Sequence, residues 1–240
     1  MKKIKAILFD LAGTLIYPKD PVGYVYSNVA RSFGFETDYR KLDEKFAEVV
    51  KKEVPPVAGE LEEKKWWREV VFKTFDLCGY DLKNKFDEVF KELFKVFSQK
   101  SAWTIYPDVI PVLEKLFGGV CHGKLVQIGL ISNFDSRLEI ILKELELNKY
   151  FHCLAYSGKV GFSKPDPKIF QYALNELNII PEEALYVGDS LNIDYYPACD
   201  LGINSLLLNR EGNYSMGLLQ QAQGIKTILN LNEIFNFIAF

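Results

Sequence analysis

The chain has 240 residues, of which 48% are hydrophobic and 25% are charged, and its formal net charge is -3. A chain of this length and composition can bury a sizeable apolar core without disulfide or metal staples, and so small a negative charge offers no attraction to nucleic acid. Its four cysteines form no CxxC pair and no stretch is apolar for long enough to span a membrane, so we expect a cytoplasmic protein that binds neither nucleic acid nor a membrane.

The first predicted element is a buried strand. Residues 4–10, Ile-Lys-Ala-Ile-Leu-Phe-Asp, form a short apolar run with an acid at its end. A run of this kind, bounded by polar residues, is typical of a parallel strand that is covered on both faces. The loop that follows carries the sequence LAGTL.

A helical segment interrupts the chain directly after this loop. Residues 18–101 show apolar residues at helical spacing and no strand pattern. We expect them to form an all-helical domain inserted into a core domain made of residues 1–17 and 102–240. Because open α/β sheets bind ligands at the carboxyl ends of their strands, an insert at this point is a candidate cap over the ligand site. Its amphipathic stretches are Val22–Phe33, Tyr39–Val50, Glu60–Leu77 and Leu82–Phe97.

The remainder of the chain alternates strand patterns with helix patterns. Amphipathic helices are indicated within residues 136–150 and 166–179. Such alternation predicts an α/β fold, a Rossmann-like doubly wound parallel sheet with helices on both faces. The predicted strands lie within Leu125–Asn133, Glu182–Ser190 and Asn204–Arg210, with a weaker one at His152–Ser157.

Polar side chains stand where these strands end. Asp10 ends the first strand, Ser132 and Asn133 end the second long one, Asp189 ends the next, and Lys164 precedes a helix. In a doubly wound sheet these ends converge. Two carboxylates, a hydroxyl and an ammonium group suit an anionic substrate and a divalent cation, since a carboxylate can attack phosphorus while the cation, lysine and hydroxyl neutralise the phosphoryl oxygens.

The segments FDLAGTL, ISN, SKPDP and GDSLNID occur in this order along the chain. Together they resemble the four motifs of the haloacid dehalogenase (HAD) superfamily. The stretches WWREVVFKTFDLCG and SNFDSRLEIIL further resemble its REG-2-like branch. The resemblance implies a Rossmann-like core, a mobile helical cap and hydrolysis of a small phosphorylated molecule through an aspartyl-phosphate. A monomer or a homodimer is expected.

The same resemblance implies roles for the motif residues. Asp10 would be the nucleophile, and Ser132, Asn133 and Lys164 would hold the phosphate, with Lys164 also contributing to catalysis. The cofactor would be Mg²⁺. Its ligands would be Asp10, the backbone carbonyl of Ala12 and Asp189, with Asp194 in support.

Ala12 departs from the pattern of the superfamily. Most of its phosphatases carry at this position an aspartate that protonates the leaving alcohol and then activates water. Such acid–base help is worth about 10²–10⁴ in rate, or roughly 3–5 kcal/mol of barrier. A site without it requires a leaving group that needs no proton, another proton donor, or a different reaction.

Three alternatives follow from this departure. The chain could be a non-catalytic relative that binds a phosphate ligand or a protein partner. It could also resemble phosphonoacetaldehyde hydrolases, which carry alanine here, keep the metal and cleave a C–P bond with the help of a cap lysine. The 2-haloacid dehalogenases also lack this acid, but they use no metal, and Asp189 disfavours them. The lysines that the insert offers are Lys41, Lys45, Lys51, Lys52, Lys64 and Lys65.

Overall fold

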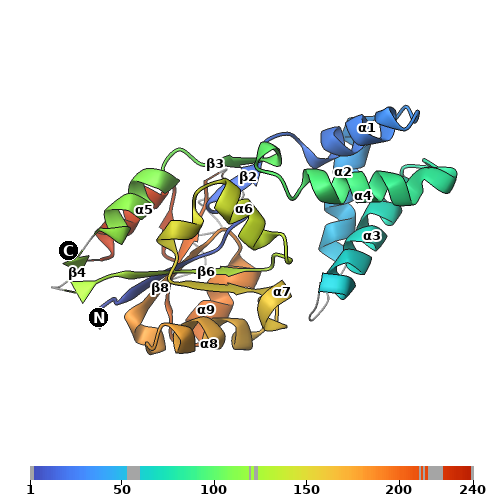
Figure 1. Cartoon of the computed structure of the whole chain (residues 1–240). Coiled ribbons are helices and arrows are strands. Elements are labelled where there is room, and N and C mark those ends of the chain that lie inside the picture. Colours follow the sequence, from blue (N-terminus) through green and yellow to red (C-terminus); the bar gives the residue numbers. More distant parts are fainter. Residues whose placement is uncertain are drawn as a thin grey trace.

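The computed structural model describes residues 3–52, 60–118, 120–121, 124–210, 212, 214–215 and 224–238. It has two parts, a core built around a sheet and a helical lobe beside it (Figure 1). Within the described residues, no helix combines the length and the apolar character that a membrane span requires.

A six-stranded sheet forms the centre of the core, and each pair of neighbouring strands in it is parallel. Strand β1 lies in the middle and is buried along its whole length. Its neighbours on the two sides are β6 and β8. The strands in spatial order are β10 (Thr227–Ile228), β9 (Asn204–Leu208), β8 (Ala184–Gly188), β1 (Ala6–Phe9), β6 (Gln127–Ser132) and β7 (Cys153–Tyr156).

Helices cover both faces of this sheet (Figure 1). Side chains alternate along β1, so Ile7 and Phe9 join one apolar cluster while Ala6 and Leu8 join the other. The first cluster is completed by α5 and α6, the second by α8 and α9. The core helices are α5 (Val109–Phe117), α6 (Leu138–Glu144), α7 (Ser157–Val160), α8 (Pro167–Glu176) and α9 (Tyr196–Asp200).

The predicted doubly wound α/β fold is confirmed, and each of the five predicted strand regions contains a strand of the sheet. The sixth strand, β10, was not predicted because it has only two residues. A small hairpin, β4 (Val120–Cys121) with β5 (Lys124–Leu125), lies outside the sheet.

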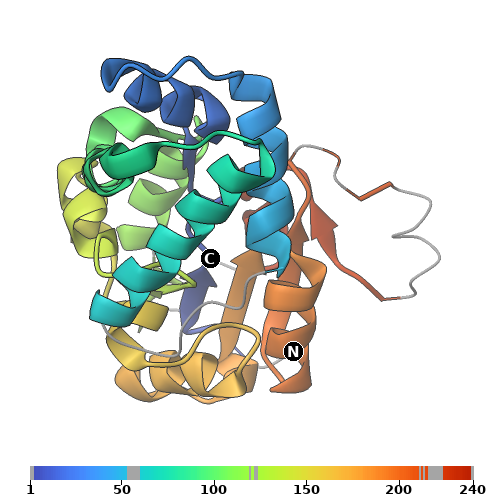
Figure 2. The same ribbon diagram turned by 90° about the vertical axis from the view of Figure 1, so that its right-hand side faces the viewer.

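Four helices are inserted between β2 (Ile16–Pro18) and β3 (Trp103–Ile105), which pair as an antiparallel ribbon. This ribbon forms a neck through which the chain leaves the core and returns to it (Figure 1). Seen from the side of the insert, the four helices lie in front of the sheet (Figure 2). They share an apolar cluster of their own. They are α1 (Val22–Ser32), α2 (Tyr39–Lys52), α3 (Glu60–Leu77) and α4 (Phe86–Val96).

Helices α1 and α2 make their closest approach at Gly23. A Cβ atom built on Gly23 would lie 2.2 Å from the backbone oxygen of Tyr39 and 2.3 Å from the backbone nitrogen of Asp43. The Gly23 N–H also donates to Asp43 Oδ1 at 2.9 Å. Because the obstructing atoms belong to the backbone, any larger residue must push the two helices apart.

We therefore expect Gly23→Ala to lower the free energy of unfolding by about 1–3 kcal/mol through overpacking. Urea unfolding followed by circular dichroism measures this. Gly118→Ala is the control, because its added methyl group would meet nothing closer than 3.7 Å. Equal stabilities of the two variants would contradict this account of the α1–α2 contact.

Candidate active site

The ends of three neighbouring strands form the floor of the site. Asp10 directly follows β1, Ser132 is the last residue of β6, and Asp189 directly follows β8. The register aligns these ends, because Phe9 pairs with Leu130 on one side and with Val187 on the other. The predicted convergence of the strand ends is therefore present in the sheet.

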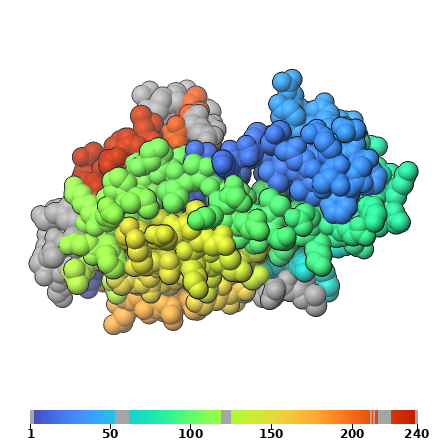
Figure 3. Space-filling model, turned by 45° about the horizontal axis from the view of Figure 1, so that its top comes forward, coloured from blue at the N-terminus to red at the C-terminus, as the bar shows by residue number. Residues whose placement is uncertain are grey.

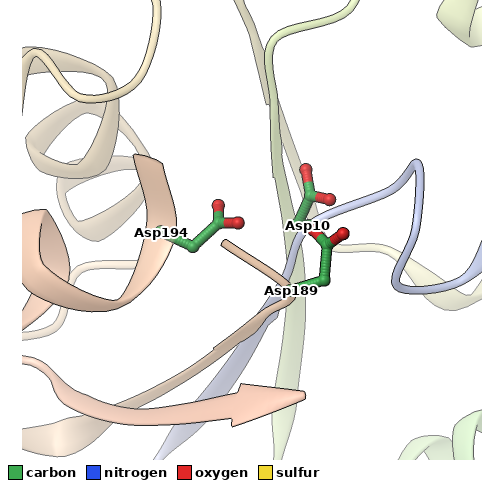
Figure 4. Close-up of side chains that lie close together, drawn as sticks. All are labelled: Asp10, Asp189 and Asp194. Atoms are coloured by element: carbon green, nitrogen blue, oxygen red, sulfur yellow. The ribbon is translucent and has the colours of Figure 1, made fainter. Parts of the chain in front are cut away.

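Three carboxylates converge at this edge (Figure 4). Asp10, Asp189 and Asp194 each offer an oxygen, and these oxygens all lie within 4.8 Å of one another. Asp194 belongs to a π-helical turn, Leu191–Tyr195, that follows β8. The N–H of Ser190 donates to Asp194 Oδ2 at 3.0 Å, and the Tyr186 hydroxyl donates to Oδ1 at 2.7 Å. These two bonds fix the direction of the Asp194 carboxylate.

Lys164 is buried between two of the acids. Its Nζ donates to Asp10 Oδ1 at 2.6 Å and to Asp194 Oδ1 at 2.7 Å, and it also donates to the Tyr186 hydroxyl at 3.1 Å. Burial alone would lower the Lys164 pKa, but attraction to Asp10 and Asp194 outweighs burial and raises it. The side chain is therefore a fixed cation at neutral pH.

One ammonium group does not balance three acids. Burial raises the pKa of Asp10 to about 6, although Lys164 opposes this. Burial, and then the charges of Asp10 and Asp194, raise the pKa of Asp189 to about 7. Within the described residues, no lysine or arginine forms an ion pair with Asp189. Carboxylate oxygens are ligands that suit Mg²⁺, so these residues fit that ion.

The loop after β1 passes close to Asp189. Gly13 has φ +87°, and a Cβ atom there would lie only 2.4 Å from Asp189 Oδ2. Both the backbone conformation and the lack of space require glycine. Ala12, one residue earlier, is exposed. The role predicted for its carbonyl as a metal ligand stays a prediction.

Ser132 and Asn133 lie beside Lys164. Ser132 is buried at the end of β6. The Asn133 side chain donates from Nδ2 to the Lys164 carbonyl at 2.8 Å and accepts from the Lys164 N–H at 2.6 Å. Asn133 thus positions the backbone of Lys164, a role that was not predicted from the sequence. Phosphate binding by Ser132 and Asn133 stays a prediction.

A polar cluster joins the loop after β6 to the inserted helices. Asp135 and Arg137 form a buried ion pair. The Trp67 Nε1–H of α3 donates to Asp135 Oδ2 at 2.6 Å, and the Arg137 guanidinium lies 4.0 Å from the centre of the Phe94 ring of α4. Glu63 of α3 accepts from the N–H of Ser136 at 3.1 Å. We call Glu63, Trp67, Asp135 and Arg137 the latch.

The latch was not predicted from the sequence. Its members come from two segments about 70 positions apart, and neither segment shows a pattern that marks a buried ion pair. Only the occurrence of an acid and a base within SNFDSR gave a signal.

A pocket of about 230 Å³ lies between the inserted helices and the core. In the space-filling view these two parts of the molecule touch (Figure 3). We call this space the aromatic pocket, since most of its walls are rings. It is lined by Ala12, Pro18, Val22, Tyr26, Phe46, Trp67, Val71, Phe90, Leu93, Phe94, Phe97, Trp103, Asn133, Phe134 and Arg137.

Comparisons with known proteins agree with this architecture. A family model described as haloacid dehalogenase-like hydrolase matches residues 4–198. The human haloacid dehalogenase-like hydrolase domain-containing protein 3 is 30% identical over 211 residues, covering 86% of this chain and 82% of that protein. The Rhythmically expressed gene 2 protein of Drosophila melanogaster is 27% identical, covering 88% of this chain and 85% of that protein. A HAD phosphatase structure from Thermococcus onnurineus matches with a TM-score of 0.64 and 27% identity, covering 98% of this chain and 97% of that one.

The crowding of acids predicts an effect on stability. Because the Asp189 pKa rises on folding to about 7, its ionised form destabilises the folded state, fully above that pH and less as the pH falls toward 4. We expect Asp189→Asn to raise the free energy of unfolding of the metal-free protein at pH 8 by on the order of 1–3 kcal/mol. Thermal unfolding in EDTA measures this.

The increase in the free energy of unfolding caused by Asp189→Asn should become smaller as the pH is lowered from 8 toward 4. Asp200→Asn is the control, since Asp200 is exposed. A variant less stable than the wild type at pH 8 would show that Asp189 is not under repulsion in the metal-free protein.

Proposed function

The chain belongs to the haloacid dehalogenase-like hydrolases, in their REG-2-like branch, and we propose that it is a Mg²⁺-dependent phosphatase of a small phosphorylated molecule. One observation carries the proposal. The Asp10 carboxylate contacts the buried Lys164 ammonium and shares an oxygen cluster with Asp189 and Asp194. A nucleophile beside a fixed cation and a cation-binding acid cluster suits phosphoryl transfer.

In the proposed first step, an oxygen of Asp10 forms a bond to phosphorus. The bond between phosphorus and the leaving oxygen breaks, and its electron pair stays on that oxygen. The oxygen of a water molecule then bonds to the phosphorus of the aspartyl-phosphate. The bond between phosphorus and the Asp10 oxygen breaks with its electron pair on Asp10, a proton of the water passes to solvent, and phosphate is released. Lys164 neutralises charge on the transferring group throughout.

Asp10, Asp189, the Ala12 carbonyl and, in support, Asp194 would hold Mg²⁺. The ion would neutralise the phosphoryl oxygens and lower the pKa of Asp10, so that the nucleophile is ionised. We further propose that residues 18–101 act as the cap that selects the substrate.

One alternative function is that of a non-catalytic relative that binds phosphate or a protein partner. Ala12 is the residue that favours this alternative.

A second alternative is cleavage of a C–P bond, which needs a lysine over the site. Among the described residues, no lysine lines the aromatic pocket. Lys41 Nζ donates to the Cys78 carbonyl at 2.8 Å, and Lys45 and Lys52 both pair with Glu48. These contacts disfavour Lys41, Lys45 and Lys52 as the catalytic lysine. Lys64 Nζ lies 5.5 Å from the centre of the Phe94 ring, so Lys64 is the candidate that the C–P alternative retains.

The proposal predicts that the protein hydrolyses p-nitrophenyl phosphate in the presence of Mg²⁺ and that Asp10→Asn abolishes this. The nitrophenolate departs readily without a proton, so the lack of an acid at Ala12 matters least with this substrate. Release of nitrophenolate, followed with and without EDTA, measures the activity.

Asp200→Asn serves as the control for a change of aspartate to asparagine at an exposed position. It should keep wild-type turnover. Turnover that persists in Asp10→Asn would remove the proposed nucleophile, and no turnover in any form would shift the weight to the non-catalytic reading.

A second prediction concerns the missing acid. Ala12 is exposed at the edge of the pocket, so a longer side chain there has room. We expect Ala12→Asp to raise kcat/KM for an alkyl phosphate by about 10-fold or more, because general acid help is worth about 10²–10⁴. The gain for p-nitrophenyl phosphate should be much smaller. Equal gains for both esters would mean that protonation of the leaving group is not what limits the wild type.

A further inference from the structure

We infer that the aromatic pocket binds the leaving group and that this group is a phenol, so that the substrates are aryl phosphate monoesters. The inference rests on the proposed phosphatase function and names its substrate class. Four properties of the pocket support it: its location, its lining side chains, its volume and its lack of a proton donor.

The pocket reaches the loop that follows the proposed nucleophile. Its core side includes Ala12, two residues after Asp10, and Asn133, which hydrogen-bonds to the backbone of Lys164. The opposite wall comes from all four inserted helices. A phosphoryl group held by Asp10 and Lys164 would therefore place its ester oxygen at the mouth of this space.

The walls leave few groups for a polar ligand. Both ends of the Asn133 amide are used by Lys164, and Arg137 is paired with Asp135. The indole N–H of Trp67 also donates to Asp135. Burying the hydroxyls of a sugar or a polyol against such walls costs free energy for each unmatched group. A flat apolar ring instead gains area and ring-to-ring contacts.

The size of the pocket fits a ring. A cavity of roughly 150 Å³ lined by apolar side chains can take up benzene. The aromatic pocket has about 230 Å³. It therefore has room for one substituted ring or for two small fused rings.

The lack of a proton donor near the leaving group also favours aryl phosphates as substrates. Among the described lining residues, the only hydroxyl is that of Tyr26, and burial raises its pKa above the ordinary value, so it is a poor acid at neutral pH. The P–O bond must break with its electron pair left on an unprotonated oxygen, which later takes a proton from solvent. A phenol has a pKa of about 10, whereas aliphatic alcohols are closer to water at roughly 16. Of these two kinds of ester, only the phenyl ester releases its leaving group readily in this way.

Binding tests the pocket without turnover. The probes are 2-naphthylmethylphosphonate and ethylphosphonate, which share a head group and differ in the ring, with Mg²⁺ present and calorimetry as the readout. We expect the naphthyl compound to bind at least tenfold more tightly. Val22→Phe, which adds a ring at the pocket wall, should reduce this preference at least fivefold. Val25→Phe, on the same helix outside the pocket, should not.

Equal binding of the two phosphonates to the wild type would overturn the inference, and this comparison does not depend on how a variant folds. A preference that Val22→Phe leaves intact, in a folded variant, would also overturn it, because the ring would then bind elsewhere.

Turnover separates the inference from the function on which it rests. Three substrates are compared. The first is 2-naphthyl phosphate. Cyclohexyl phosphate has a ring but a poor leaving group, and acetyl phosphate has a good leaving group but no ring. We expect kcat/KM to be highest for 2-naphthyl phosphate, by at least tenfold. If acetyl phosphate is hydrolysed equally well, the inference fails while the phosphatase stands. If the naphthyl phosphonate binds selectively and none of the three phosphates is hydrolysed, the proposed phosphatase function is contradicted. The preference of the pocket for aromatic ligands would then still stand.

Discussion

The ion pairs of Lys164 are the interaction on which the rest of the site depends. Its ammonium group joins Asp10 at the end of β1 to Asp194 in the turn after β8, and Asn133 at the end of β6 holds its backbone. Three strand ends are thereby fixed against one another by the ammonium group and the backbone of one buried residue. A buried charge of this kind is costly unless it is paired. The same cost makes the acid cluster a strained arrangement, and a divalent cation would relieve that strain.

Two of the contacts between the inserted helices and the core differ in kind. The β2–β3 ribbon is a covalent neck, whereas the latch is a polar contact between separate segments. The aromatic pocket lies between them and takes its walls from both parts of the molecule. Its shape therefore depends on how the two parts meet, and any motion that breaks the latch would also open the pocket. If the proposed cap role holds, substrate selection and enclosure of the reaction would be one event.

The sequence predicted those features that local patterns encode. Apolar runs with polar ends located the strands and Asp10, Ser132 and Asp189, because parallel strands must end at one edge of the sheet. The ribbon was not predicted, since three-residue strands with partly exposed side chains carry no such pattern. The roles of Tyr186 and Arg137 were hidden for another reason. The Tyr186 hydroxyl accepts from Lys164, which lies 22 positions earlier, and the Arg137 guanidinium lies on the ring of Phe94, 43 positions earlier. Only packing brings such partners together. The predicted ligand and phosphate roles remain predictions.

The neck has a consequence for how such proteins diversify. Pro18 and Trp103 are Cα partners in the ribbon, so the two ends of the insert lie next to each other. The core sheet is complete without the insert, because none of its strands comes from residues 18–101. A segment whose two ends lie side by side can be replaced without a change in the path of the core chain. Over evolutionary time, a new specificity could therefore arise by exchange of a module, while the chemistry at the strand ends descends unchanged.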